Sequence, residues 1–209
     1  LSPEVLLVQG DVTSDDDCRR IAGHIRETWG RLDILVNSAG TTRVVDGRDL
    51  DALSTSDFDA AFSVNCRGPF QMIRAARSML EASKGSVVNV SSHAGISGYG
   101  SSLAYAASKG ALNTLTLGLA RSLAPAIRVN GVCPGFVHTD WLKRRVDPQT
   151  WLALQESMKA GTALNIAVEA QNVAECVFWL ATSPAVTGHL LVVDAGTHLA
   201  IAAPLPQRS

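Results

Sequence analysis

Three polar side chains near the middle of the sequence could carry out acid–base chemistry on a carbonyl or an alcohol. Tyr105 and Lys109 are four residues apart, so they share one face of a helix. A free phenol has a pKa of about 10 and transfers protons poorly near neutral pH. A cation one turn away and the positive end of a helix both favour the phenolate, so we expect the pKa of Tyr105 to fall toward neutrality. Ser92 could hold a substrate oxygen beside this phenol.

A strand and a helix are expected to position these groups. The apolar, β-branched run 86–90 predicts a buried parallel strand that ends close to Ser92. Ser101 or Ser102 can cap a helix that runs to about residue 123 and stops before Pro125. In open α/β sheets ligands bind beyond the carboxyl ends of the strands, which is where Ser92 falls.

Composition describes an ordinary enzyme-like chain of one domain. The 209 residues are 46% hydrophobic and 18% charged, with a formal net charge of -1, so nothing indicates a surface for nucleic acids or other polyanions. No apolar run reaches the roughly 18 residues that span a bilayer, and the first residues lack a signal pattern. We therefore expect a cytoplasmic location without membrane contact. The four cysteines are scattered and predict buried thiols, not a metal site.

Strand and helix patterns alternate along the chain, which predicts a parallel α/β sheet. The run 5–8 is apolar, a helix capped by Ser14 should reach Trp29, and 32–36 reads as a buried strand. Ser56 could cap the next helix, which Pro69 should kink or restart. Met72, Ile73, Ala76 and Leu80 form its inward stripe, and further elements are expected at 127–132 (strand), 148–160 and 169–181 (helices) and 190–193 (strand).

These motifs resemble those of the short-chain dehydrogenase/reductase family. The serine thirteen residues before the tyrosine, the Tyr-x-x-x-Lys helix and the run Val-Asn-Val-Ser-Ser at 88–92 carry the resemblance. It implies hydride transfer between NAD or NADP and a carbonyl or secondary alcohol, with Tyr105 as general acid/base. Ser92 would orient the substrate oxygen, and Lys109 would tune the phenol and bind the nicotinamide ribose. Asn65 would be the fourth catalytic residue, at a helix irregularity; the alternative is a core asparagine that satisfies backbone groups.

The resemblance also implies a set of cofactor-binding residues. They are Asp11, Val12, Asn37, Ala39, Gly40, Tyr105, Lys109, Pro134, Gly135, Val137 and Thr139. Asp11 would bind the adenine amine, although it could also be a plain turn residue. Two small departures from the family pattern are Ser38 in place of a second asparagine and Ala195 in place of a glycine. The sequence does not distinguish NAD from NADP as the cofactor.

The region 136–166 is expected to form an apolar lid over the substrate. Asp147 followed by proline should open a short helix that ends at Gly161. The apolar side chains of the lid are Trp141, Leu142, Trp151, Leu154 and Met158. The basic run 143–145 could meet an anionic group or could be a solvated loop face, and 200–209 reads as a tail. The resemblance further implies a homodimer or homotetramer, paired through helices at 57–82 and 102–124.

The resemblance begins at the third strand of the family, without the glycine-rich loop that precedes it there. The expected fold is therefore a Rossmann-like, doubly wound parallel sheet that lacks its first two strands, as one partial domain over 1–209. Between the strands at 5–8 and 34–36 this leaves about 14 Å, because neighbouring strands lie ~4.8 Å apart. Either these two strands pair directly or an apolar edge stays open. The sequence is thus expected to be a truncated form or a partial record.

Two functions remain open at this point. The first is an NAD(P)-dependent oxidoreductase acting on a small carbonyl or alcohol substrate. The second is a catalytically silent, truncated subunit that acts as an oligomerisation or binding module.

Overall fold

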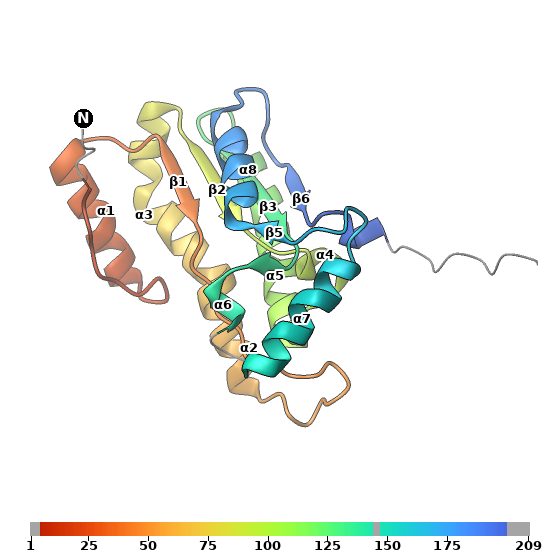
Figure 1. Cartoon of the computed structure of the whole chain (residues 1–209). Coiled ribbons are helices and arrows are strands. Elements are labelled where there is room, and N and C mark those ends of the chain that lie inside the picture. The colour runs from red at the N-terminus through yellow and green to blue at the C-terminus, as the bar shows by residue number, and fades with distance from the viewer. Residues whose placement is uncertain (1–4, 144–146, 200–209) are drawn as a thin grey trace, which may run out of the picture.

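A four-stranded parallel sheet forms the centre of the molecule (Figure 1). The computed structural model describes residues 5–143 and 147–199. The strand order is β1–β2–β3–β6, and each neighbouring pair is parallel. The strands are β1 (Ile34–Asn37), β2 (Ser86–Val90), β3 (Arg128–Pro134) and β6 (Leu190–Val193). This arrangement confirms the expected Rossmann-like α/β fold.

Helices cover both faces of this sheet. The helices of the described residues are α1 (Asp15–Trp29), α2 (Thr55–Phe62), α3 (Gly68–Ser83), α4 (Ala94–Ser97), α5 (Leu103–Leu123), α6 (Asp140–Lys143), α7 (Pro148–Ala160) and α8 (Ala170–Thr182), of which α3 and α5 pack on one face of the sheet and α8 on the other. Two short strands, β4 (Val137–His138) and β5 (Val168–Glu169), pair in parallel beside the main sheet. No helix in the described part of the chain is long and apolar enough to cross a membrane.

The core lies in two layers, one on each side of the sheet. On the side of α3 and α5, Leu80, Val87 and Ile127 are fully buried in one apolar cluster. On the side of α8, Val132 and Leu180 are buried in a second cluster. Because successive residues of β2 point to opposite faces, Val87 joins the first cluster and Val88 the second. The expected inward stripe of α3 is confirmed, since all four of its side chains are buried.

Capping residues place the helix ends where the sequence predicted them. Ser14 caps α1 by accepting a hydrogen bond from the Asp17 amide, and Gly30 ends that helix with φ 68°. Ser102 caps α5 and Asp147 caps α7. The start of α2 differs from the prediction, because the residue that caps this helix is Ser54 and not Ser56. Ser54 and Asp57 satisfy each other's backbone amides, so a capping box fixes the start of α2.

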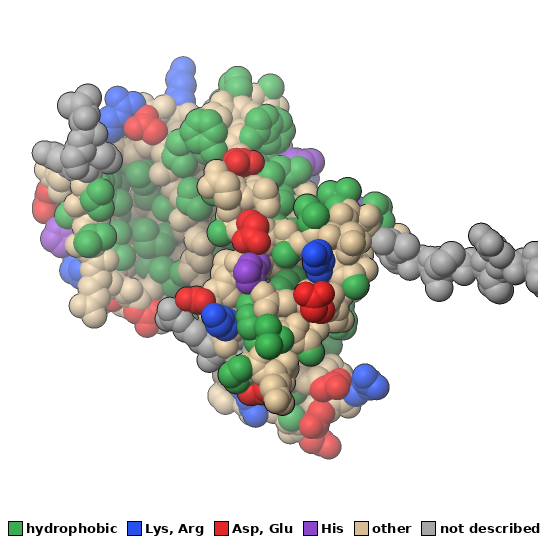
Figure 2. Space-filling model, viewed as in Figure 1, with side chains coloured by type: hydrophobic (Ala, Val, Ile, Leu, Met, Phe, Trp, Pro, Cys, Tyr) green, Lys and Arg blue, Asp and Glu red, His purple; other side chains and the backbone are tan. Residues whose placement is uncertain are grey.

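The first apolar run does not form the expected strand. Residues 5–8 have no sheet partner among the described residues, and Val5 and Leu7 are 73% and 89% exposed. A strand needs a neighbour to bond its backbone, and within 5–143 and 147–199 β1 is paired on one side only, with β2. Of the two outcomes considered, the open edge is the one observed. Ile34 and Val36 of β1 are partly exposed, and Figure 2 shows apolar side chains on this side of the molecule.

Some expected features lie outside the described residues. These are Arg144 and Arg145 of the basic run and the tail at 200–209, and the side chains of Trp141 and Leu142 are likewise not described.

The turn after β6 contains an alanine in the left-handed region. Ala195 has φ 51°, and the following Gly196 has φ 84°. A side chain carrying Cβ is disfavoured there, by roughly 1–2 kcal/mol per residue. The alanine at position 195, where the resemblance led us to expect a glycine, therefore stores backbone strain.

We predict that Ala195→Gly raises the free energy of unfolding by about 1 kcal/mol, because the relieved strain exceeds the added chain entropy of glycine. Urea denaturation monitored by circular dichroism measures this change. As a matched control, Ala60→Gly in the exposed part of α2 should lower stability by about 1 kcal/mol. A loss of stability in Ala195→Gly would show that the turn is not strained.

Candidate functional site

A cleft of about 1400 Å³ opens at the carboxyl ends of β1, β2 and β3. Its lining includes Ser92, Tyr105 and Lys109, the three side chains that the sequence singled out. Most other lining groups are apolar, contributed by the loop at 44–48, by α7 and by α8. An apolar cleft with a few convergent polar groups is the usual form of a small-molecule site.

Ser92 and Tyr105 meet at the floor of this cleft. Ser92 is the second residue after the end of β2, and its Oγ accepts a hydrogen bond of 3.1 Å from the Ala94 amide. Tyr105 lies in the first turn of α5, where the Ser102 cap accepts a hydrogen bond from its amide. A hydrogen bond links the Tyr105 phenol to the Ser92 side chain. The pair can therefore hold an oxygen atom of a ligand between two hydroxyl groups.

The pKa of Tyr105 differs from the sequence-based expectation. Burial of the phenol raises its pKa, and the hydrogen bond with Ser92 offsets only part of this effect. The expected fall toward neutrality was wrong for this state of the protein, because the cost of removing the phenolate from water outweighs the favourable neighbours. A phenol whose pKa is raised in this way keeps its proton at neutral pH.

The position and the burial of Lys109 explain why its ammonium group does little to lower the pKa of Tyr105. The ammonium group lies 5.8 Å from the centre of the Tyr105 ring and donates a hydrogen bond of 2.8 Å to the Val90 carbonyl. The residue is 4% exposed, and burial lowers the pKa of Lys109 to about 8. A group that is itself close to losing its proton stabilises a neighbouring anion weakly at alkaline pH.

Asn65 lies in a π-helical segment, Ser63–Arg67, between α2 and α3. Its side chain is fully buried, accepts a hydrogen bond from the Thr41 amide and donates to the Thr41 carbonyl. It also donates to Ser108 Oγ at 2.9 Å, one residue before Lys109. The helix irregularity is where the resemblance placed it, and the side chain makes the backbone contacts of the alternative interpretation. A role of Asn65 in catalysis stays a prediction.

The expected cofactor-binding residues fall into two groups. Those that line the cleft are Gly40, Tyr105, Lys109, Pro134, Gly135, Val137 and Thr139. Gly135 is required sterically, because a Cβ there would lie 2.7 Å from Asp194 Cβ. Asn37 and Ala39 are near the cleft in sequence but do not line it. The Asn37 side chain instead donates a hydrogen bond of 2.9 Å to Asn89 Oδ1.

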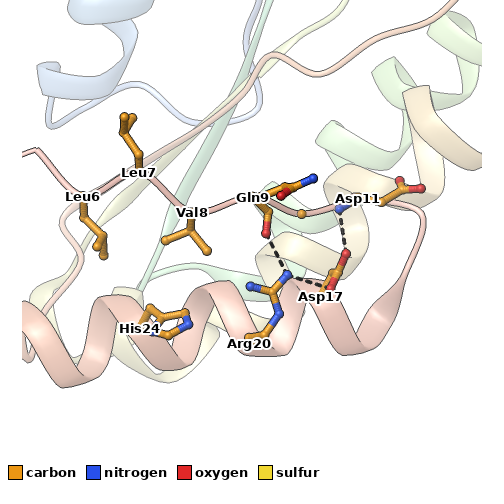
Figure 3. Close-up of a pocket in the computed structure, with 9 residues that line it drawn as sticks. Leu6, Leu7, Val8, Gln9, Asp11, Asp17, Arg20 and His24 are labelled. Carbon is orange, nitrogen blue, oxygen red and sulfur yellow. Dashed lines mark hydrogen bonds and ion pairs between the residues drawn. The ribbon is translucent and has the colours of Figure 1, made fainter.

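Asp11 and Val12 lie away from this cleft. Asp11 borders a second, smaller pocket between the segment at 6–10 and α1 (Figure 3). Arg20 bonds the Gln9 carbonyl and Asp17, and Asp17 accepts a hydrogen bond from the Asp11 amide. The Asp11 carboxylate accepts from the Thr13 amide, as a turn residue does. The Val12 carbonyl accepts a hydrogen bond from the side chain of Gln71, on α3.

Sequence reasoning missed a cluster of acidic and imidazole groups beside Ser92. His93 lines the cleft, and its Nε2 lies 3.8 Å from a carboxylate oxygen of Asp194. His198 approaches the same buried carboxylate at 2.9 Å and holds the pKa of Asp194 below its usual range, against the effect of burial. The adjacency of His93 to Ser92 was a signal in the sequence, whereas the approach of Asp194 across the end of β3 was not.

The sequence is similar to those of known reductases. A family model described as Enoyl-(Acyl carrier protein) reductase matches residues 1–198. The chain is 37% identical over 191 residues to human 3-oxoacyl-[acyl-carrier-protein] reductase, covering 90% of this chain and 76% of that protein.

Solved structures show the same fold. A candidate short-chain dehydrogenase/reductase from Burkholderia xenovorans has 40% identity and a TM-score of 0.84, covering 93% of this chain and 76% of that one. A gluconate 5-dehydrogenase from Burkholderia cenocepacia, solved with NADP and tartrate, has 28% identity and a TM-score of 0.82, covering 92% and 74%. With the match of the family model to nearly all of the sequence, the chain belongs to the short-chain dehydrogenase/reductase family and is an NAD(P)-dependent oxidoreductase.

Proposed function

We propose that this protein reduces a carbonyl group to a secondary alcohol, with Tyr105 as the general acid and Ser92 as the group that holds the substrate oxygen. The observation that carries the proposal is the hydrogen-bonded pair of hydroxyls at the floor of the apolar cleft. In this direction the phenol gives its proton to the oxygen that becomes the alcohol. The raised pKa of Tyr105 supports the reductive direction at neutral pH, because the phenol is then protonated.

Lys109 has two tasks in this proposal. Its ammonium group lies 5.8 Å from the centre of the Tyr105 ring, and it favours the phenolate that forms when the proton has left. It also faces the cleft, where it can donate hydrogen bonds to the ribose of a nicotinamide cofactor. Both tasks need the protonated form of the lysine.

The cleft fits the nicotinamide end of NAD or NADP. Gly40, Pro134, Gly135, Val137 and Thr139 would hold it, with backbone able to come close where no side chain intervenes. When bound, this cofactor supplies the hydride. These residues would contact the nicotinamide end of the cofactor, so they support the binding of that end alone.

The region 136–166 is proposed as the lid of the substrate site. Leu154 and Met158 of α7 line the cleft, whereas Trp151 is buried against Phe136 and His138. The pairing of β4 with β5 joins the start of this region to the segment that directly follows it. An apolar lid favours substrates with an apolar body next to the carbonyl. Because the human relative is named for 3-oxoacyl reduction, a 3-oxoacyl thioester is the first substrate to test.

A measurement of cofactor binding distinguishes the two functions, an enzyme and a catalytically silent binding module. Fluorescence titration with NADH and NADPH should show binding in the micromolar range if the chain is an enzyme. Self-association of the chain is compatible with both the enzyme and the binding module. We propose a homo-oligomer through the helices at 57–82 and 102–124, where Phe58, Phe62 and Leu117 are partly exposed.

We predict that Tyr105→Phe lowers kcat for the reduction of acetoacetyl-CoA by NADPH at least 10³-fold, because the general acid is lost while the ring stays in place. Binding of NADPH, followed by fluorescence, should change little. Glu27→Ala serves as a control, because Glu27 is exposed on α1 and lies outside both the cleft lining and the proposed lid. Activity of Tyr105→Phe within tenfold of the unchanged chain would remove the assignment.

We also predict that kcat for reduction falls as the pH rises through about 8, the pKa of Lys109. The active form has Lys109 protonated, and deprotonation removes both its hydrogen bonds to the cofactor and its stabilisation of the phenolate. A pH–rate profile between pH 6 and 10 measures this. The residual activity of Lys109→Met should show no such decline. A decline retained in that variant would assign it to another group.

A further inference from the structure

A buried asparagine connects the catalytic helix to the segment that carries Ser92. Asn113 lies two turns beyond Tyr105 on α5, at the same helical face as Lys109, and is buried. Its Oδ1 accepts a hydrogen bond of 2.5 Å from Ser91 Oγ. Its Nδ2 donates one of 3.2 Å to the Gly95 carbonyl. One side chain thus bonds residues on both sides of Ser92.

Close backbone contact reinforces this connection. A Cβ on Gly95 would lie 2.5 Å from the Lys109 carbonyl carbon and 2.7 Å from the Gly110 nitrogen, so the segment lies directly against α5. Ser91 Oγ is also 3.2 Å from the Lys109 carbonyl oxygen. Close packing leaves the 91–95 segment little freedom as long as its hydrogen bonds to the helix are intact.

We propose that Asn113 is a positioning residue: it fixes the 91–95 segment against α5 and so sets where the Ser92 hydroxyl meets the Tyr105 phenol. This inference rests on the proposed function of that pair. It assigns to Asn113 no contact with the substrate, because the residue does not line the cleft. The polar groups that face Asn113 are Ser91, the Gly95 carbonyl and the thiol of Cys133, which lies 3.7 Å from Oδ1.

The connection has a measurable consequence at Tyr105. The Ser92 hydrogen bond lowers the pKa of the phenol against the effect of burial, and it can do so only when the Ser92 hydroxyl is in place. Release of the 91–95 segment should weaken that bond. The pKa of Tyr105 should then rise further, in the direction that removal of the Ser92 hydroxyl itself produces.

The chain offers a direct readout, because it contains two tyrosines and the other, Tyr99, can be replaced. In a Tyr99→Phe background, phenolate absorbance reports Tyr105 alone, without cofactor or substrate. We expect Ser92→Ala to raise its pKa by about one unit, the value of one lost hydrogen bond. Asn113→Ala and Ser91→Ala should each raise it in the same direction, and their double variant should shift it no more than one single variant does.

Thr116→Val is the matched control. Thr116 is a buried polar residue of the same helix that accepts a hydrogen bond from Asn89, in β2, and not from the 91–95 segment. This variant should lose a comparable amount of stability and leave the pKa of Tyr105 unchanged. Circular dichroism at each pH identifies the range in which each variant is folded. If Asn113→Ala does not fold, Ser91→Ala carries the test.

The outcomes separate this inference from the proposed function. If Ser92→Ala moves the pKa of Tyr105 but neither Asn113→Ala nor Ser91→Ala does, the positioning role is overturned and the proposed function stands. If Thr116→Val moves the pKa as much as Asn113→Ala, the effect is general loosening and the positioning role is again overturned. If Ser92→Ala leaves the pKa unchanged, the hydroxyl pair itself, and with it the proposed function, is contradicted.

Discussion

Burial of ionisable groups at the carboxyl edge of the sheet governs the chemistry of this site. A phenol and an ammonium group both lose water there, and each responds by favouring its neutral form. For Tyr105 this means a proton available for transfer at neutral pH, and for Lys109 it means a charge that is lost near pH 8. The same desolvation therefore keeps the phenol protonated and limits the pH range in which its neighbour carries a charge. The Ser92 hydroxyl acts against burial by stabilising the phenolate.

The fold supplies this burial through contacts between elements far apart in the sequence. Parallel pairing of β1, β2 and β3 brings their carboxyl ends to one edge, where Ser92 and the residues after Pro134 meet. Glycines let backbone segments approach where side chains would collide: Gly95 lies against α5, and Gly135 admits Asp194. Ala195 breaks this pattern with a left-handed φ that a glycine would adopt without strain.

Local signals in the sequence predicted much of this arrangement. Periodicity and capping residues identified α1, α5 and α7, and the β-branched run before Ser92 identified β2. The spacing of Ser92, Tyr105 and Lys109 placed all three at one cleft. What failed were inferences that depend on three-dimensional neighbours. Residues 5–8 have strand-like composition but no partner strand, and the pKa of Tyr105 depends on a degree of burial that spacing alone does not give. His93 and Asp194 are about a hundred positions apart in the sequence, so no local pattern predicted that their side chains lie close together.

The central claim is that Ser92 and Tyr105 together hold the oxygen atom that gains the proton. A crystal structure of the chain with NADP and a bound secondary alcohol tests it most directly. We expect the alcohol oxygen to lie within about 2.6–3.2 Å of both the Ser92 hydroxyl and the Tyr105 phenol. An alcohol oxygen held elsewhere in the cleft, for example against His93 and out of reach of Tyr105, would contradict it.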